Sequence, residues 1–299
     1  MKKSVSLLLA ALMLTGALAG CGSSASTSGT QAAGSADSGV SGAITVISRE
    51  DGSGTRGAFI ELTGVEEKTA DGKKIDNTTA DAEIANKTDV VLTSVAGNEK
   101  AIGYISLGAL NDTVKAVKVD GAEATVDNVK AGAYKLSRPF NIATKGEPTG
   151  LAKDFINFIL SKEGQAVVTD NKYIAVNDAA ESFVSDGSSG QIAVGGSSSV
   201  SPVMEKLIEA YKSVNPNASI DLQTSDSTSG MTGAMDGTFA IGMASRELKD
   251  EEAAQLTGTA IALDGIAVIV NPANTIDELS MDQIKSIYVG DITDWGDLA

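Results

Sequence analysis

Residues 48–59 read SREDGSGTRGAF, and the fold prediction starts from this stretch. It follows the apolar run AITVI at residues 43–47, which predicts a short strand, and the segment that opens at Thr55 has a helical pattern. The two glycines flanking Ser53 allow the backbone between strand and helix to approach a ligand closely. Strand, glycine turn and helix start together predict an α/β unit with a tight loop.

The same stretch carries the groups that an anion needs. The first N–H groups of a helix have no partner inside the helix, and with the helix dipole they favour phosphate or sulfate. Ser53 and Thr55 add hydroxyl donors, and Arg49 adds a fork that fits two oxygens at once. A solvent-exposed turn is the alternative, because Gly and Ser are common in turns.

Two further Gly/Ser turns follow later in the chain. The strand 191–194 is followed by GGSSSVSP at 195–202 and by an amphipathic helix whose apolar face includes Val203, Leu207 and Tyr211. The strand 220–223 is followed by the turn at 225–230. Three such turns in one chain favour a shared anion site over three solvent loops.

Composition excludes several classes of function. The chain has 299 residues, a net charge of −16, no histidine and one cysteine. The negative charge argues against nucleic acid or anionic lipid as a partner. Without histidine there is no Ser-His-Asp or Cys-His catalysis and no histidine metal site, and a single cysteine forms no intrachain disulfide and no thiolate metal cluster. Composition therefore removes these catalytic and metal-site classes, and we expect no cofactor and no metal.

The N-terminus has the pattern of an export leader. Lys2 and Lys3 precede an apolar run at 5–14 that is too short to span a bilayer, and LAGC at 18–21 resembles the bacterial lipobox. This predicts a signal peptide at 1–20 and lipidation of Cys21, with a buried structural cysteine as the alternative. Residues 21–42 are rich in Ser, Gly and Ala and predict a flexible tether. The expected location is the extracytoplasmic face of the cell membrane.

From residue 43 onward, strand and helix signals alternate, with a linker at 180–190, as in an α/β domain. With these motifs in place, residues 43–299 resemble the phosphate-binding proteins of bacterial phosphate ABC importers. The resemblance is carried by SREDGSGT at 48–55, GSSSVSP at 196–202, IGMASREL at 241–248, LDGIAVIVNP at 263–272 and ITDW at 292–295. It implies a two-lobed periplasmic-binding-protein fold of type II-like architecture, in which two crossing strands join lobes that close over phosphate.

The order of these motifs differs from that of the family. The family has the GSSSV segment first, then the ITDW segment and then the REDGSGT segment, whereas here the chain begins with the last of these. The sequence therefore resembles a circularly permuted member. This implies a contiguous lobe at 138–272 and a split lobe at 43–137 plus 273–299, with crossings near residues 137–139 and 270–272.

Permutation also predicts that Ala299 ends close to the start of the strand at Ala43, because termini that lie together tolerate permutation. A fragment of a tandem gene and a chain that swaps halves with a neighbour are the alternatives. We expect a monomer.

The resemblance also implies a set of phosphate contacts from both lobes. The implied phosphate-binding residues are Arg49, Ser53, Gly54, Thr55, Ser198, Ser199, Ser227, Ser229, Gly230, Ser245 and Arg246. Asp51 is expected to hold Arg49 in place, with simple turn formation as the alternative. Some family members have an aspartate where this chain has Ser245, and that carboxylate accepts the proton of hydrogen phosphate. Here the acceptor is Asp51, Asp226, Glu247 or a serine oxygen.

The sequence thus predicts a lipid-anchored binding protein that captures inorganic phosphate and delivers it to an ABC permease, with no chemical step. Sulfate, molybdate or an organic phosphate is the alternative ligand. A phosphohydrolase with a serine nucleophile is disfavoured, because the chain has neither histidine nor a clustered metal-carboxylate motif. A permuted homologue used for sensing or adhesion is a further alternative.

Overall fold

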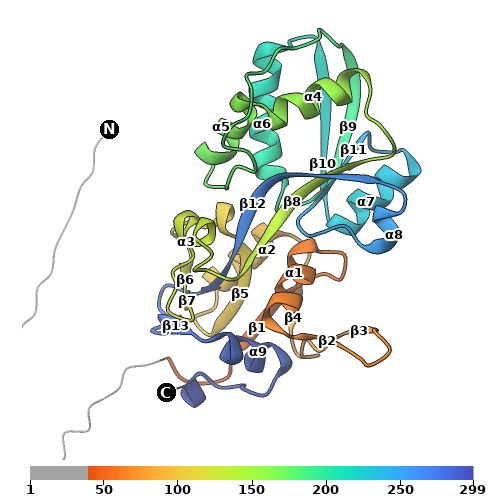
Figure 1. Cartoon of the computed structure of the whole chain (residues 1–299). Helices are drawn as coiled ribbons and strands as arrows, with labels where there is room; N and C mark the ends of the chain where they lie inside the picture. The colour runs from red at the N-terminus through yellow and green to blue at the C-terminus, as the bar shows by residue number, and fades with distance from the viewer. Residues whose placement is uncertain (1–39, 299) are drawn as a thin grey trace, which may run out of the picture. The chain divides into compact units, whose positions relative to one another are not determined.

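The computed structural model describes residues 40–298 (Figure 1). The predicted signal peptide at 1–20, the lipidation site Cys21 and the predicted tether as far as residue 39 lie outside the described residues. Between residues 40 and 298, no helix is long and apolar enough to cross a membrane.

A mixed sheet forms the frame of the molecule. Its strands run in the order β10-β9-β11-β8-β12-β5-β1-β4, and β6 pairs with β12. Neighbours at each end of the sheet are parallel, whereas β8 and β12 in the middle pair in antiparallel fashion. The strands are β1 (Thr45–Arg49), β4 (Glu83–Ala85), β5 (Ala101–Ser106), β6 (Lys115–Ala116), β8 (Ser137–Thr144), β9 (Gly190–Ser197), β10 (Ala218–Ser225), β11 (Ile241–Ala244) and β12 (Thr257–Val270).

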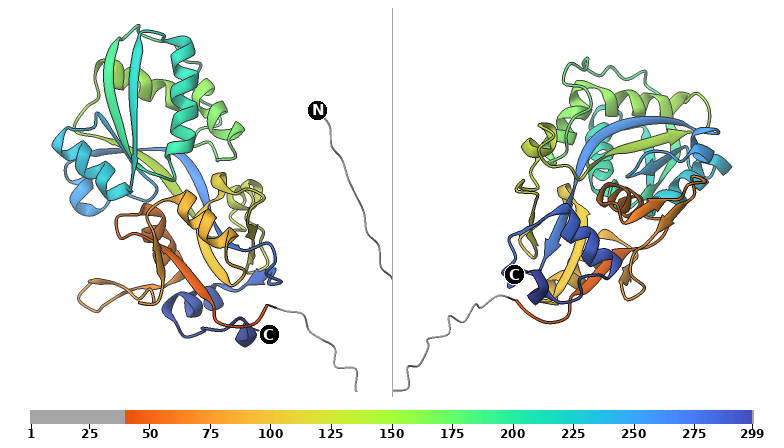
Figure 2. Two further views of the ribbon diagram at one scale, coloured as in Figure 1. Left: turned by 180° about the vertical axis from the view of Figure 1, so that it is seen from behind. Right: turned by 60° about the horizontal axis from the view of Figure 1, so that its bottom comes forward.

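Helices cover both faces of this sheet (Figures 1 and 2). They are α1 (Gly54–Thr63), α2 (Thr88–Ala96), α3 (Val126–Lys130), α4 (Gly150–Leu160), α5 (Lys162–Asp170), α6 (Ser201–Val214), α7 (Ser227–Asp236), α8 (Asp250–Ala253) and α9 (Met281–Val289). Two short 3-10 turns lie at Leu107–Ala109 and Trp295–Leu298. Two small sheets pair β2 (Glu66–Lys68) with β3 (Lys74–Asp76) and β7 (Lys118–Val119) with β13 (Glu278–Leu279).

Capping residues set the ends of the helices. The hydroxyl of Ser53 accepts the backbone N–H of Arg56 at the start of α1, and Gly64 ends that helix in the left-handed conformation. A capping box starts α9, because Ser280 and Gln283 bond each other's backbone N–H groups. The apolar face of α6 is confirmed too, since Val203, Leu207 and Tyr211 are all fully buried.

The sheet serves two lobes, each with its own core. The contiguous lobe packs α4, α5 and α6 against β9 and β11, and its core includes Phe155, Val194 and Leu207. The split lobe packs α1, α2 and α9 against β1 and β5, and its core includes Phe59 and Ile102. In Figure 1 the contiguous lobe lies above the split lobe, with β8 and β12 running between them.

The two crossing strands are β8 and β12, which lie side by side in all three views (Figures 1 and 2). The first part of β12 pairs with β8, up to Gly265 opposite Ser137, and its last part pairs with β5, from Ile266 opposite Ser106. Strand β12 therefore passes from one core to the other at Gly265–Ile266.

The predicted second crossing at 270–272 was wrong in position, because residues 266–270 belong to the core of the split lobe. Asn271 also belongs there, since its side chain donates to the carbonyl oxygens of Val95 and Ala96. The apolar run 263–270 gave no sign of a change of lobe within it, and Pro272 marks only the end of the strand. The wider division of the chain into lobes stays a prediction.

The two ends of the described chain meet in the split lobe. Ala43 forms an antiparallel bridge with Asp294, and the N–H of Ile44 donates to the carbonyl of Thr293 at 2.8 Å. Trp295 is 1% exposed, and its indole N–H donates to the carbonyl of Lys100 at 3.0 Å. Residues 293–295 thus lie beside the start of β1, whereas Ala299, for which the proximity was predicted, lies outside the described residues.

Candidate functional site

Seven hydroxyl groups gather where the two lobes meet, and we call them the hydroxyl cluster. Its members are Thr55, Thr88, Ser197, Ser198, Ser199, Ser227 and Ser245. Each of them is at most 7% exposed. They come from the first residues of α1, α2 and α7, from the turn that precedes α6 and from the residue that follows β11. The N-terminal ends of four helices, each nine residues or longer, therefore meet at one place.

Hydrogen bonds between members of the cluster join the lobes. The hydroxyl of Thr55 in the split lobe lies 2.8 Å from that of Ser199 in the contiguous lobe. A guanidinium nitrogen of Arg49, also in the split lobe, donates to Ser198 at 3.1 Å. Residues about 150 positions apart in the sequence are thus in contact, and the lobes are closed upon each other.

Glycine is required at position 54 by this closure. A Cβ atom at Gly54 would lie 2.3 Å from the hydroxyl oxygen of Ser227 and 2.8 Å from that of Ser245. Both serines belong to the opposite lobe, and the hydroxyl of Ser227 also accepts the backbone N–H of Ser245 at 3.1 Å. Ser53 lies at the edge of the site, where its hydroxyl caps α1.

Arg49 brings a positive charge to the hydroxyl cluster, and the carboxylate that pairs with it differs from the predicted one. Its side chain is 2% exposed and donates through two nitrogens to the carboxylate of Glu50, both at 2.8 Å. Asp51, expected to hold Arg49, is instead 97% exposed and pairs with Arg56 at 3.0 Å. The expectation was wrong because Asp51 lies in the turn after β1 and faces solvent, whereas Glu50 directly follows Arg49 at the end of the strand.

Arg246 is the second predicted arginine, and its charge is directed away from the cluster. Its guanidinium forms two hydrogen bonds of 2.7 and 2.8 Å with the carboxylate of Glu252. Burial of Glu252 favours the neutral carboxyl, but the hydrogen bonds from Arg246 and from the Lys249 backbone outweigh it and lower the pKa of Glu252. Arg246 is therefore held in an ion pair within its own lobe.

Two other predicted residues also have roles outside the cluster. Ser229 is exposed, and both its hydroxyl and its N–H donate to the carboxylate of Asp226, the N-cap of α7. Gly230 is buried against β9 and β11, where a Cβ would lie 2.7 Å from the Cα of Gly196 and 2.7 Å from the carbonyl of Met243. The turn that contains Ser227 is brought to the site, but these two neighbours serve the helix and its packing.

Sequence reasoning missed Thr88, Ser197 and Glu50. Thr88 is the first residue of α2, and its hydroxyl lies 3.4 Å from that of Ser199 and 3.5 Å from that of Ser198. The motif TDVVL at 88–92, with Asp89 in the first turn, is a helix-start signal that could have identified a fourth helix N-terminus. Ser197 donates to Ser245 at 3.0 Å and adjoins the two serines that were predicted.

A buried ion pair lies where the two crossing strands pair. Arg138 on β8 donates to Asp264 on β12 at 3.1 Å, and both residues are at most 3% exposed. Ser106 also donates to Asp264, at 3.0 Å. Burial lowers the pKa of Arg138 to about 10 and raises the pKa of Asp264 to about 6, although each partner stabilises the charge of the other.

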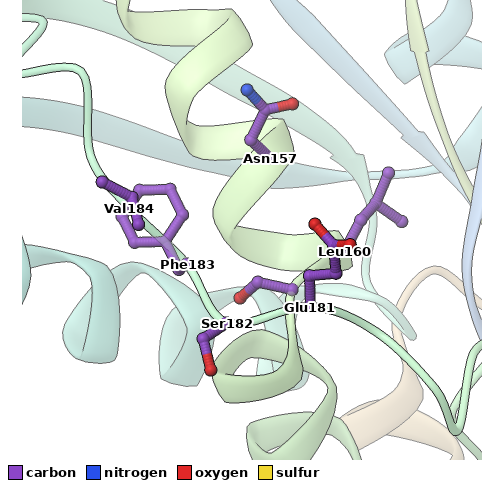
Figure 3. A pocket seen from close by; sticks show the side chains of 7 residues that line it. Asn157, Leu160, Glu181, Ser182, Phe183 and Val184 are labelled. Atoms are coloured by element: carbon purple, nitrogen blue, oxygen red, sulfur yellow. The ribbon is translucent and has the colours of Figure 1, made fainter.

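Two hollows lie outside the cluster. A groove of about 970 Å³ between the lobes is lined by α1, by β2 and β3, and by residues 246–251, and its walls include Arg56, Lys74 and Arg246. A smaller pocket of about 220 Å³ lies between α4 and the segment 181–184, where Figure 3 shows Asn157 and Leu160 on the helix and Phe183 and Val184 on the segment. The smaller pocket shares no residue with the hydroxyl cluster.

Comparison with known proteins identifies close relatives. A family model described as the PBP superfamily domain matches residues 26–163 and 182–299. The chain is 50% identical over 300 residues to the phosphate-binding protein PstS 2 of Streptococcus agalactiae, covering 99% of this chain and 98% of that protein. The phosphate-binding protein PstS of Bacillus subtilis is 34% identical over 137 residues, which are 45% of this chain and 42% of that protein.

A solved structure matches as well. The crystal structure of a phosphate-binding protein of a phosphate ABC transporter from Streptococcus pneumoniae TIGR4 has a TM-score of 0.70 and is 50% identical in sequence. The match covers 86% of this chain and 100% of that chain.

Proposed function

We propose the function of this chain from its family: the chain belongs to the PBP superfamily and, within it, to the PstS phosphate-binding proteins. It is a phosphate-binding protein of a phosphate ABC transporter. The observation that carries this function is the hydroxyl cluster, in which helix N-termini, buried hydroxyls and the guanidinium of Arg49 converge from both lobes.

The cluster provides hydrogen-bond donors for an oxyanion, and most of these donors are neutral groups and not cations. Hydroxyl groups can rotate to donate to phosphate oxygens, the positive N-terminal ends of four helices meet at the same place, and Arg49 donates charge-assisted bonds. Each of these is a binding interaction, and none activates a nucleophile. The chain therefore captures its ligand and releases it unchanged.

The group that accepts the proton of hydrogen phosphate is, in this proposal, a serine oxygen. Asp51 and Glu247 are exposed, and the carboxylate of Asp226 is occupied by Ser229 as the cap of α7. Hydroxyl oxygens of the cluster can accept as well as donate, so Ser245 or a neighbour can take this bond. Sulfate has no proton to donate, and a hydroxyl can instead turn to donate to it. Discrimination against sulfate is therefore weaker than a carboxylate acceptor would give.

Calorimetric titration of the purified protein with inorganic phosphate tests the ligand. We expect saturable binding at one site per chain, and competition by sulfate only at higher concentration. Saturable binding of sulfate or molybdate with phosphate excluded would assign the site to that oxyanion.

Delivery to a permease and attachment to the membrane complete the proposal. The match to binding proteins of ABC transporters supports an importer as partner and a location outside the cytoplasm. The proposal also takes the protein to be a monomer. The LAGC motif supports lipidation of Cys21. Cys21→Ser is expected to release the protein from the membrane fraction, and retention of that variant in the membrane fraction would contradict the anchor.

Circular permutation remains a proposal, and two observations support it. The chain aligns over nearly its whole length with the streptococcal relative but over less than half with the relative from Bacillus subtilis. The two ends of the described chain also pair with each other. The family order can be restored by joining the present C-terminus to the start of β1 and opening the chain directly before Gly190. This rearranged chain is expected to fold and to bind phosphate. A fragment or a half-swapped dimer would instead require a second chain, which light scattering would detect.

A further inference from the structure

The turn at residues 50–54 contacts the opposite lobe at a second point outside the hydroxyl cluster. The carbonyl oxygen of Gly52 accepts two hydrogen bonds from Thr228, one from its backbone N–H at 3.1 Å and one from its hydroxyl at 3.2 Å. Thr228 is the second residue of α7, so this N–H is one of the donors that a helix leaves free at its start. The backbone N–H of Thr228 in the contiguous lobe thus finds its acceptor in the backbone of the split lobe.

No side chain fits at Gly52 in this arrangement. A Cβ atom there would lie 2.3 Å from Oδ1 and 2.6 Å from Cγ of Asp226. The Asp226 carboxylate is fixed, because it accepts the N–H of Ser229 at 2.9 Å and the hydroxyl of Ser229 at 2.5 Å. The φ angle of Gly52 lies outside the positive range that favours glycine. Glycine is therefore needed here for the approach of the other lobe and not for the local backbone conformation.

We propose that Gly52, Thr228 and Asp226 form an interlobe latch that sets how closely the lobes approach and so sets the affinity of the site. This inference rests on the proposed function, since it concerns closure over the same oxyanion. The latch exists only when the lobes are closed, and in an open state the three residues are apart. A methyl group at residue 52 therefore destabilises the closed state alone, which lowers its population and the apparent affinity in proportion.

Gly57 provides the matched control for a test by substitution. It lies in α1, directly after the turn, and a Cβ there would also face the contiguous lobe, but at 3.7 Å from Cδ of Arg246, an ordinary van der Waals distance. Gly52→Ala is expected to weaken inorganic phosphate binding about tenfold or more, which corresponds to a cost of about 1.4 kcal/mol for the methyl group in the closed state. Gly57→Ala is expected to change binding less than about twofold. Calorimetry on both purified variants measures this difference.

A double variant separates steric contact from backbone stiffening. If the carboxylate of Asp226 is the obstacle, Asp226→Ala in the Gly52→Ala background restores the affinity to that of Asp226→Ala alone. If Gly52→Ala acts by restricting its own turn, the second change restores nothing, and the latch is overturned.

A distance measurement tests the latch without relying on phosphate. Spin labels at Lys212→Cys on α6 and Asp282→Cys on α9, both exposed positions, report the separation of the lobes in a Cys21→Ser background. Gly52→Ala is expected to shift the distance distribution to longer values, whereas Gly57→Ala leaves it unchanged. Identical distributions for Gly52→Ala and the parent would overturn the latch. If the parent protein fails to bind phosphate at all, the proposed function fails, and the distance distributions still decide the latch.

Discussion

Two buried arginines lie in this molecule with opposite consequences. Arg49 and Arg138 have side chains that are each 2% exposed, and each is paired with a carboxylate. The partner of Arg49, Glu50, keeps 21% of its side-chain surface exposed, and Arg49 also reaches Ser198 in the other lobe. The partner of Arg138, Asp264, has none of its side-chain surface exposed.

The difference in exposure of the two carboxylates indicates which arginine is available to bind a ligand. At the crossing of β8 and β12, both charges are removed from water, so each depends on the other and the pair belongs to the frame. At the hydroxyl cluster, the carboxylate is open to water and the guanidinium faces the donors of two lobes. We therefore propose that Arg138 serves stability and Arg49 serves binding, and the predictions below test that proposal from the largest expected effect to the smallest.

The largest effect is expected from Asp264→Ala. Removing one partner of a buried ion pair leaves Arg138 charged and unpaired, which destabilises a fold by about 3–5 kcal/mol. Chemical denaturation monitored by circular dichroism measures this loss. The double variant Arg138→Met/Asp264→Leu, which replaces both charges by apolar groups, is expected to recover most of it. A single variant as stable as the parent would contradict the proposal.

The same pair gives a pH dependence of stability. Burial raises the pKa of Asp264 to about 6, against an unfolded value of 3.8. The folded state thus binds the Asp264 proton more tightly than the unfolded state does. The stabilisation that this proton gives is complete at pH values below the unfolded-state pKa and is lost as the pH rises through 6. A shift of about two units corresponds to about 3 kcal/mol.

Other carboxylates titrate over the same interval, so the contribution of Asp264 is best taken as a difference. The stability of the parent minus that of Arg138→Met/Asp264→Leu, measured from pH 3.5 to 7, is expected to fall with rising pH. A difference that stays flat or rises would contradict the buried carboxyl.

Arg49→Ala is expected to act on binding. Hydrogen bonds to charged groups contribute about 1.5–3 kcal/mol, so the loss of Arg49 weakens phosphate binding about 10- to 100-fold. Stability falls less than for Asp264→Ala, because Glu50 can be solvated. Calorimetry and denaturation on the same preparation measure both effects. Arg49→Lys, which keeps the charge but loses the fork, is expected to restore only part of the affinity. Unchanged phosphate affinity in Arg49→Ala would remove Arg49 from the site.

The smallest effects are expected at the predicted residues that the structure places outside the cluster. Asp51→Asn and Ser229→Ala each change an exposed side chain, and their phosphate affinities are expected to stay within about twofold of the parent. Ser229→Ala removes one hydrogen bond to the cap of α7, with a stability loss of about 1 kcal/mol or less. A tenfold loss of affinity in Asp51→Asn would return Asp51 to the binding role first expected of it.

Much of the site could be predicted because its signals are local. Thr55, Ser198 and Ser227 each lie in a glycine or serine turn at the start of a helix, so strand, turn and helix patterns identify them without tertiary information. The crossing strand β8 is likewise marked by a local feature, the proline at 139, although the strand begins at Ser137.

The rest depends on side-chain direction and on contacts between lobes. Sequence places Glu50 and Asp51 one residue apart, and only the turn geometry decides that Glu50 faces Arg49 while Asp51 faces solvent. The motif around Arg246 predicts a phosphate-binding residue. Its ion pair with Glu252 depends instead on the packing of α8 within the contiguous lobe, which the sequence does not show. The steric need for Gly52 appears only when Asp226 is brought next to it, and no local pattern contains that information.

A crystal structure of the protein grown with inorganic phosphate tests the central claim most directly. The account predicts one phosphate within hydrogen-bond distance of Arg49, Thr55 and Ser198, with donors from both lobes on the same ion. Phosphate bound instead in the groove beside Arg56 and Arg246, with the hydroxyl cluster still closed upon itself, would contradict it.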